Sequence, residues 1–192
     1  MKIKIIDLNK NYQMIKSGIN KKLNSLFKKQ TFILGKEVEN LEKNLSNFLN
    51  VKYSLGVSSG TDALIVALMA CGIKKNDEVI IPDMTWISTA SSVVLLGAKP
   101  VIVDVNTSDG LIDTNSLNKK INNKTKAIIS VGLYGFLPDL EKLKKIAKKN
   151  KLYLINDGAQ SFGSKYKNNN CHKYTSISCT SFFPAKVLGS YG

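Results

Sequence analysis

The chain has 192 residues, of which 43% are hydrophobic and 22% charged, and its formal net charge is +14. This composition is typical of a soluble globular protein, with a single domain as the default, and no apolar run approaches the roughly 20 residues of a membrane span. All 28 basic residues are lysines, so the arginine contacts usual in nucleic-acid recognition are excluded, and we expect neither a nucleic-acid nor a membrane partner.

The N-terminal segment, "MKIKIIDLNKNYQ", lacks the apolar stretch and cleavage site of a signal peptide, so we expect a cytoplasmic protein. Residues 12–50 then show a helical pattern. Within it, Val38, Leu41, Leu45 and Leu49 share one face. This pattern predicts a helical N-terminal arm whose apolar stripe is part of the core.

Apolar strand patterns alternate with helical patterns over the rest of the chain. The predicted strands are 53–57, 78–82, 100–105, 126–131, 152–157 and 176–183, and the predicted helices are 61–72, 85–97, 114–122 and 139–151. Glycine ends two of these helices, at Gly72 and Gly97, as expected at a helix stop. The alternation predicts an α/β fold with three α/β/α layers and a mostly parallel sheet. No internal repeat or clear domain boundary is visible.

The three cysteines and the single histidine do not form a metal-binding pattern. Cys71, Cys171 and Cys179 show no CxxC spacing, and His172 stands beside Cys171 in a polar stretch. An odd number of cysteines without that spacing is typical of reduced thiols. We therefore expect no metal site and no disulfide framework.

Small and polar residues follow the first predicted strand. The segment "SSGTDAL", residues 58–64, opens directly into a helix. Backbone N–H groups and the helix dipole at such a turn favour a phosphate group. An ordinary Ser or Thr N-cap explains the segment equally well when it is taken alone. It matches neither the GxxxxGK[ST] nor the GxGxxG nucleotide pattern.

Other chemically suggestive residues follow later strands. Trp86 stands in "DMTWIST", Asp157 ends an apolar strand, and Ser181 and Lys186 stand in "TSFFPAK". A core tryptophan, a helix-capping aspartate and a surface lysine are the alternatives. Together, however, a phosphate site, a flat ring, a carboxylate and a lysine match the needs of pyridoxal 5'-phosphate (PLP).

Four segments in order, "SSGTDAL", "DMTWIST", "LINDGAQSFGS" and "TSFFPAKVLGSYG", resemble the DegT/StrS-type nucleotide-sugar aminotransferases, which are fold-type-I PLP enzymes. The resemblance covers essentially the whole chain. It implies that Lys186 forms the Schiff base with PLP and later moves the proton, that Asp157 pairs with the pyridine nitrogen, and that Gln160 contacts the phenolic oxygen. It further implies phosphate contacts from Gly60, Thr61, Asp62 and Ser181, and ring contacts from Trp86 and Ala159.

The resemblance implies a transfer of an amino group, typically from glutamate, to a keto group of a nucleotide-linked sugar. "CTSFFPAKVLGSYG" and "LYGFLPDL" look most like enzymes that aminate the third carbon of UDP-linked 3-keto sugar acids, in polysaccharide or related sugar biosynthesis. A non-catalytic PLP- or sugar-binding regulatory paralogue is the alternative.

The sequence departs from the family pattern in three ways. Gly132 stands where many members carry histidine, and Asn156 replaces the usual glutamate before the aspartate. Family members are also roughly twice as long, in keeping with a second, smaller domain. We therefore expect residues 1–192 to contain the N-terminal arm and most of the PLP-binding large domain, without the C-terminal small domain, and we expect a homodimer of the full-length protein.

Overall fold

A computed structural model of the chain describes residues 6–190. These residues fall into two compact units, of which the first ends at Gly56 and the second begins at Val57. All residues of the site predicted from the sequence belong to the second unit. Within the described residues, no helix is both long enough and apolar enough to cross a membrane.

The first unit contains two helices, α1 (Leu8–Lys29) and α2 (Lys36–Leu49). The prediction of one helical pattern over 12–50 is therefore wrong at 30–35. Gln30 adopts a left-handed conformation (φ 56°) and its N–H bonds to Leu26 O, which ends α1. The predicted core stripe of α2 is also wrong, because no residue of α2 is buried.

Residues 53–57, predicted as a strand, lie outside every sheet of the described chain. Their polar groups bind side chains of α2 instead. Glu42 Oε1 accepts the N–H of Gly56 at 2.7 Å, and Ser46 Oγ donates to Ser54 Oγ at 3.0 Å. These hydrogen bonds of the segment are therefore made to side chains, whereas a strand would bond to the backbone of a neighbouring strand.

The second unit is built on a five-stranded parallel sheet with strand order β2-β1-β3-β4-β7. The strands are β1 (Glu78–Pro82), β2 (Lys99–Val103), β3 (Thr125–Val131), β4 (Tyr153–Asp157) and β7 (Ile177–Cys179). Ile80 is opposite Val101 on one side and Ile128 on the other. Because all strands are parallel, their carboxyl ends meet at one edge, where ligands bind in such sheets.

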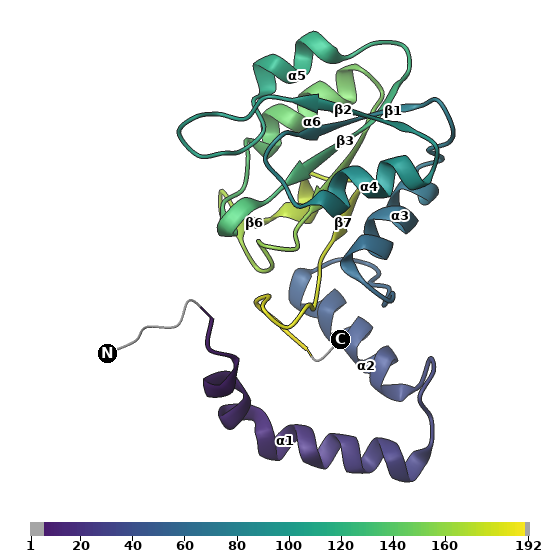
Figure 1. Cartoon of the computed structure of the whole chain (residues 1–192), viewed down its shortest axis with the longest axis vertical. Helices are drawn as coiled ribbons and strands as arrows, with labels where there is room; N and C mark the ends of the chain where they lie inside the picture. Colours follow the sequence, from purple (N-terminus) through teal and green to yellow (C-terminus); the bar gives the residue numbers. More distant parts are fainter. Residues whose placement is uncertain (1–5, 191–192) are drawn as a thin grey trace. The chain divides into compact units, whose positions relative to one another are not determined.

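Helices cover both faces of this sheet (Figure 1). α3 (Gly60–Ala70) and α4 (Ile87–Leu95) pack on one face, and α5 (Thr114–Lys120) and α6 (Leu140–Lys149) pack on the other. Successive strand residues alternate between the two cores: Ile129 and Ile155 belong to the first, and Ile128 and Leu154 to the second. The three-layer α/β/α prediction is confirmed.

Several local predictions in this unit are also confirmed. The helices α3 and α4 are followed by Gly72 and Gly97 with positive φ angles of 73° and 71°. Leu140, Leu143, Ile146 and Ala147 of α6 are buried, as their spacing predicts. The strand predicted over 176–183 is shorter, however, because regular pairing with β4 ends at Cys179.

The remaining elements are short. β5 (Lys165–Tyr166) and β6 (Asn169–Asn170) form a hairpin, and η1 (Leu133–Gly135) and η2 (Cys171–Lys173) are single turns.

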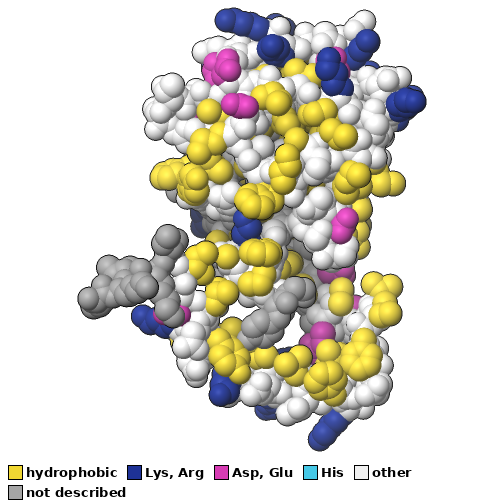
Figure 2. All heavy atoms as spheres, viewed as in Figure 1, with side chains coloured by type: hydrophobic (Ala, Val, Ile, Leu, Met, Phe, Trp, Pro, Cys, Tyr) yellow, Lys and Arg dark blue, Asp and Glu magenta, His cyan; other side chains and the backbone are white. Residues whose placement is uncertain are grey.

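Some apolar side chains of the helices remain exposed: Met69, Val94 and Leu95 are each more than half exposed. Hydrophobic side chains are accordingly visible at the surface in the space-filling view (Figure 2).

Candidate active site

The N-terminus of α3 lies directly against the loop that follows β7. A Cβ atom placed on Gly60 would lie 2.8 Å from Ser181 Cβ and 3.2 Å from Ser181 Oγ. Only glycine permits this approach, because it carries no side chain. The first backbone N–H groups of the helix and the Ser181 hydroxyl are therefore brought together, as an anion site requires.

Asp62 is tied into the same helix turn. Ser58 Oγ and Ser59 Oγ donate to Asp62 Oδ2 at 2.6 and 2.8 Å, and these hydrogen bonds lower the pKa of the carboxyl group. Its backbone N–H donates to Ser59 Oγ at 3.0 Å. Asp62 thus shapes the turn, while Thr61 Oγ1 donates to Ser88 Oγ on α4 at 2.8 Å. A contact from either residue to a phosphate stays a prediction.

Asp157 occupies the carboxyl end of β4, between β3 and β7. Its side chain is nearly fully buried, at 7% exposure. Burial raises the pKa of the carboxyl group, while the N–H of Ala159 on Oδ1, the hydroxyl of Thr89 on Oδ2 and the nearby charge of Lys186 oppose that rise. A buried carboxylate with donors on both oxygens and a cation nearby is a candidate functional group.

Lys186 is carried by a loop that closes on itself. Its N–H donates to Phe183 O at 2.8 Å, Gly189 N–H donates to Lys186 O at 2.9 Å, and Ser190 N–H donates to Phe182 O at 2.8 Å. The residue is half-buried. The structure thus brings Lys186 to the same edge as Asp157, close enough for its charge to act on that carboxyl group.

Trp86 follows β1 and Gln160 follows β4, at the carboxyl ends of these parallel strands. Trp86 is the N-cap of α4 and is 70% exposed, which contradicts the alternative of a core tryptophan. Gln160 is half-buried, and its Oε1 accepts the N–H of Tyr134 at 3.3 Å. Ala159 is also half-buried, beside Asp157. A ring contact from Trp86 or Ala159 stays a prediction.

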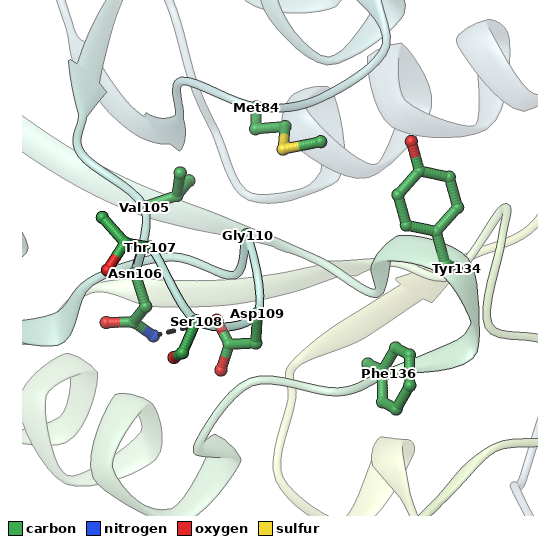
Figure 3. Close-up of a pocket in the computed structure, with 9 residues that line it drawn as sticks. All are labelled: Met84, Val105, Asn106, Thr107, Ser108, Asp109, Gly110, Tyr134 and Phe136. Atoms are coloured by element: carbon green, nitrogen blue, oxygen red, sulfur yellow. Dashed lines mark hydrogen bonds between the residues drawn. The ribbon is translucent and has the colours of Figure 1, made fainter.

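A pocket of about 540 Å³ opens next to these residues, beyond the ends of β1, β2 and β3. Figure 3 shows Met84, the 105–110 loop, and the rings of Tyr134 and Phe136 around it, with a hydrogen bond of 3.2 Å from Asn106 Nδ2 to Asp109 Oδ1. Tyr134 takes a left-handed conformation (φ 51°). Its bond to Gln160 joins the pocket to the candidate cofactor residues.

Gly132 and Asn156, the two residues that depart from the family pattern, both lie in tightly packed surroundings. A Cβ on Gly132 would overlap Ser161 Oγ and lie 2.6 Å from Ser161 Cβ, so no side chain fits there beside serine. Asn156 is 1% exposed, and its Nδ2 lies 3.5 Å from Cys171 Sγ. The N–H of Gly132 donates to the backbone oxygen of Asp157 at 3.0 Å, so Gly132 also helps to hold the end of β4.

Thr89 is the residue that sequence reasoning missed. It lies in "DMTWIST", the segment used for Trp86, and its hydroxyl binds the buried carboxylate of Asp157. A threonine in the first turn of a helix reads as an ordinary capping or surface residue, so the sequence gives it no distinct signal. Among residues 6–190, no cluster of three His, Cys, Asp or Glu side chains could hold a metal ion, and all three cysteines are free and buried.

The same fold occurs in solved structures. DesV of S. venezuelae, solved in complex with a ketimine intermediate, superposes with a TM-score of 0.96 at 30% identity, over 100% of this chain and 52% of DesV. NtdA of Bacillus subtilis, solved with bound cofactor PMP, superposes with a TM-score of 0.90 at 32% identity, over 100% of this chain and 43% of NtdA. The fold is that of fold-type-I PLP-dependent transferases.

Sequence comparison identifies the family. Residues 13–192 match the DegT/DnrJ/EryC1/StrS aminotransferase family, and the chain belongs to it. The UDP-2-acetamido-2-deoxy-3-oxo-D-glucuronate aminotransferase of Pseudomonas aeruginosa is 42% identical over 190 residues, which are 99% of this chain and 53% of that protein. The chain thus spans about half the length of the curated relatives it matches. The resemblance stated from the four sequence segments is confirmed.

Proposed function

We propose that this protein takes part in a PLP-dependent transfer of an amino group to a keto group of a nucleotide-linked sugar. The observation that carries the proposal is the placement of Asp157, Lys186 and the Gly60–Ser181 contact at one edge of the sheet. Family membership and the solved neighbours, one of which binds PMP, support it.

The residues present fit PLP on structural grounds. The close approach of Gly60 and Ser181 brings backbone N–H groups and the Ser181 hydroxyl together at the start of α3. This suits a phosphate dianion. Asp157 is buried and keeps a donor on each oxygen, which suits a carboxylate that must stay ionised beside a protonated ring nitrogen.

When bound, PLP would supply an electron sink for the bond changes at the amino-acid carbon. In this proposal Lys186 would hold the cofactor covalently through Nζ and, once released, would move the proton at the amino-acid carbon. The Asp157 carboxylate would keep the ring nitrogen protonated. Gln160 contacts the phenolic oxygen, and Trp86 and Ala159 flank the ring. Gly60, Thr61, Asp62 and Ser181 orient the phosphate.

We further propose the substrate class. The pocket beside Gln160 offers about 540 Å³ next to the cofactor residues, enough room for a substrate group. The Pseudomonas relative is named for a UDP-linked 3-oxo sugar acid. We therefore propose amination at the third carbon of such a sugar, with glutamate as donor, in polysaccharide or related sugar biosynthesis. The exposed apolar residues of α3 and α4 support a homodimer.

The test is to incubate the protein with PLP, reduce with borohydride, and map the labelled peptide. We expect the label on Lys186. Lys186→Ala should abolish it, whereas Lys144→Ala should retain it, because Lys144 Nζ binds Lys173 O away from the site. Isotope-labelled glutamate then reports the donor through the pyridoxamine phosphate formed. Label spread over many lysines would contradict the proposal.

A further inference from the structure

A chain of hydroxyl groups leads from the loop after β1 to the buried carboxylate of β4. Thr85 Oγ1 lies 2.8 Å from Thr89 Oγ1, and Thr89 Oγ1 donates to Asp157 Oδ2 at 3.0 Å. Thr89 is 0% exposed and Asp157 is 7% exposed. The contact joins residues 68 positions apart in sequence, so it depends on the tertiary fold.

The direction of this chain follows from the number of protons. A threonine hydroxyl has one proton to donate and can also accept. Because an ionised carboxylate can only accept hydrogen bonds, the Thr89 hydroxyl must be the donor to Asp157. Thr85 must then be the donor in the Thr85–Thr89 contact. Each hydroxyl polarises the next, which strengthens the bond that reaches the carboxylate.

We propose that Thr85 and Thr89 are positioning residues that orient the Asp157 carboxylate toward the pyridine nitrogen of PLP. The inference rests on the proposed function, since it assigns a role toward that cofactor. Ala159 N–H holds Oδ1 at 3.2 Å while Thr89 holds Oδ2. With both oxygens bound, rotation of the carboxylate is blocked, and each oxygen keeps further lone pairs for the ring N–H.

The location of the two threonines adds a second consequence. They flank Trp86, the predicted ring-stacking residue, and the N–H of Thr89 donates to Trp86 O at 3.0 Å. The branched side chain of Thr89 has few accessible rotamers at the start of a helix. The hydroxyl chain therefore fixes the segment that would contact the cofactor face and the group that would contact its nitrogen as one unit.

Ser92, on the same helix, provides the structural comparison. It is 0% exposed like Thr89, but its hydroxyl donates to the backbone oxygen of Thr89 at 3.1 Å. A hydroxyl that serves only the helix should affect stability without affecting the ring nitrogen. Ser92→Ala is therefore the matched control for Thr89→Val.

The test compares two ligands with the whole 192-residue chain, PLP and its 1-deaza analogue, in which CH replaces the ring nitrogen. Dissociation constants are measured by absorbance titration for the wild type and for T89V, T89S, T85V and S92A. We expect T89V to weaken PLP binding about tenfold, the scale of one hydrogen bond to a charged group. We expect T89V to leave binding of the analogue unchanged, T89S to restore PLP binding, and T85V to give a smaller loss.

The outcomes separate the inference from the proposed function. If the wild type binds neither ligand, both fail. If the wild type binds PLP and T89V binds it equally well, the positioning role is overturned while the proposed function stands. The same conclusion follows if T89V weakens binding of both ligands by the same factor and T85V and T89S show no selective effect. An effect of S92A as large and as selective as that of T89V would also overturn it.

Discussion

Gly60, the first residue of α3, and Ser181, in the loop after β7, approach so closely that a Cβ on Gly60 would lie 2.8 Å from the Ser181 Cβ. The two residues are 121 positions apart in the chain. The helix start and the loop that precedes Lys186 are therefore fitted closely to each other.

Gly60→Ala should weaken binding of PLP much more than binding of pyridoxal, which lacks the phosphate. The added methyl group must displace Ser181, and a well-packed site cannot absorb such a shift without loss. Titration of both ligands checks this. Gly18→Ala is the control: a Cβ there meets nothing within 4 Å, so it should leave both affinities unchanged and stabilise α1 by about 0.5–1 kcal/mol. Equal affinity of Gly60→Ala and wild type for PLP would contradict the prediction.

Asp157→Asn should stabilise the ligand-free protein at neutral and alkaline pH. Burial raises the pKa of the Asp157 carboxyl above its unfolded value, so the ionised form carries a cost whenever the pH is above the folded-state pKa. The asparagine lacks that cost, and we expect a gain of roughly 1–3 kcal/mol, the scale of a desolvated buried polar group. Chemical denaturation of the apoprotein measures it.

The pH dependence of that gain is the stricter test. As the pH falls through the raised pKa, Asp157 becomes protonated in the native state and the advantage of asparagine should disappear. The charge of Lys186 acts on Asp157 in the opposite direction to burial and lowers its pKa. Asp113→Asn should show the opposite trend, because hydrogen bonds from Asn115 and Ser116 lower the pKa of Asp113. That variant should lose stability at neutral pH, and the loss should vanish in acid.

Gly132→Ala should destabilise the protein, because its Cβ would overlap Ser161 Oγ. Overpacking of this kind typically costs about 1–3 kcal/mol. Adding Ser161→Gly removes the obstructing side chain, so the double variant should recover part of the loss. Denaturant midpoints of the two single variants and the double variant supply the comparison. If Gly132→Ala is as stable as wild type, the close approach has no energetic weight.

The three cysteines should resist alkylation in the native protein. Burial raises the pKa of the Cys71, Cys171 and Cys179 thiols, that of Cys179 to about 12. Since the thiolate is the reactive form, iodoacetamide at pH 8 should label them slowly when folded and fully after unfolding in guanidinium. Mass spectrometry of digested samples measures each position. Rapid labelling of Cys179 in the native protein would show that its burial is transient.

Much of the second unit is predictable because its pattern and its burial agree. Runs such as "EVIIP" and "KAIISV" are buried on both faces, so near-continuous hydrophobicity identifies them as parallel strands. The residues that follow the strands could be grouped for a related reason, since parallel strands deliver their carboxyl ends to one edge. The same reasoning predicts that Asp157, Ser181 and Lys186 lie near one another.

The errors arise where side chains from elsewhere replace the expected backbone partners. The segment 53–57 has a strand-like composition, but Glu42 captures the Gly56 N–H. The sequence does not predict the hairpin of β5 and β6. Its turn residues, Lys167 and Asn168, have positive φ angles of 47° and 62°, and of these two residue types only asparagine is typical of such a turn. Thr89 was missed because its partner is distant in sequence. A local pattern cannot reveal such contacts.

The loop that carries Lys186 has a mechanical consequence. The backbone–backbone hydrogen bonds of this loop link Phe182, Phe183, Lys186, Gly189 and Ser190 to one another, and the Phe183 N–H donates to Ser181 Oγ. The strand β7 pairs separately with β4 up to Cys179. Because Ser181 lies tightly against Gly60, a displacement of the lysine is confined to residues 182–190 and leaves the pairing of β7 with β4 intact. The lysine can therefore shift with its own loop, while the Asp157 carboxylate stays held by Thr89 and Ala159.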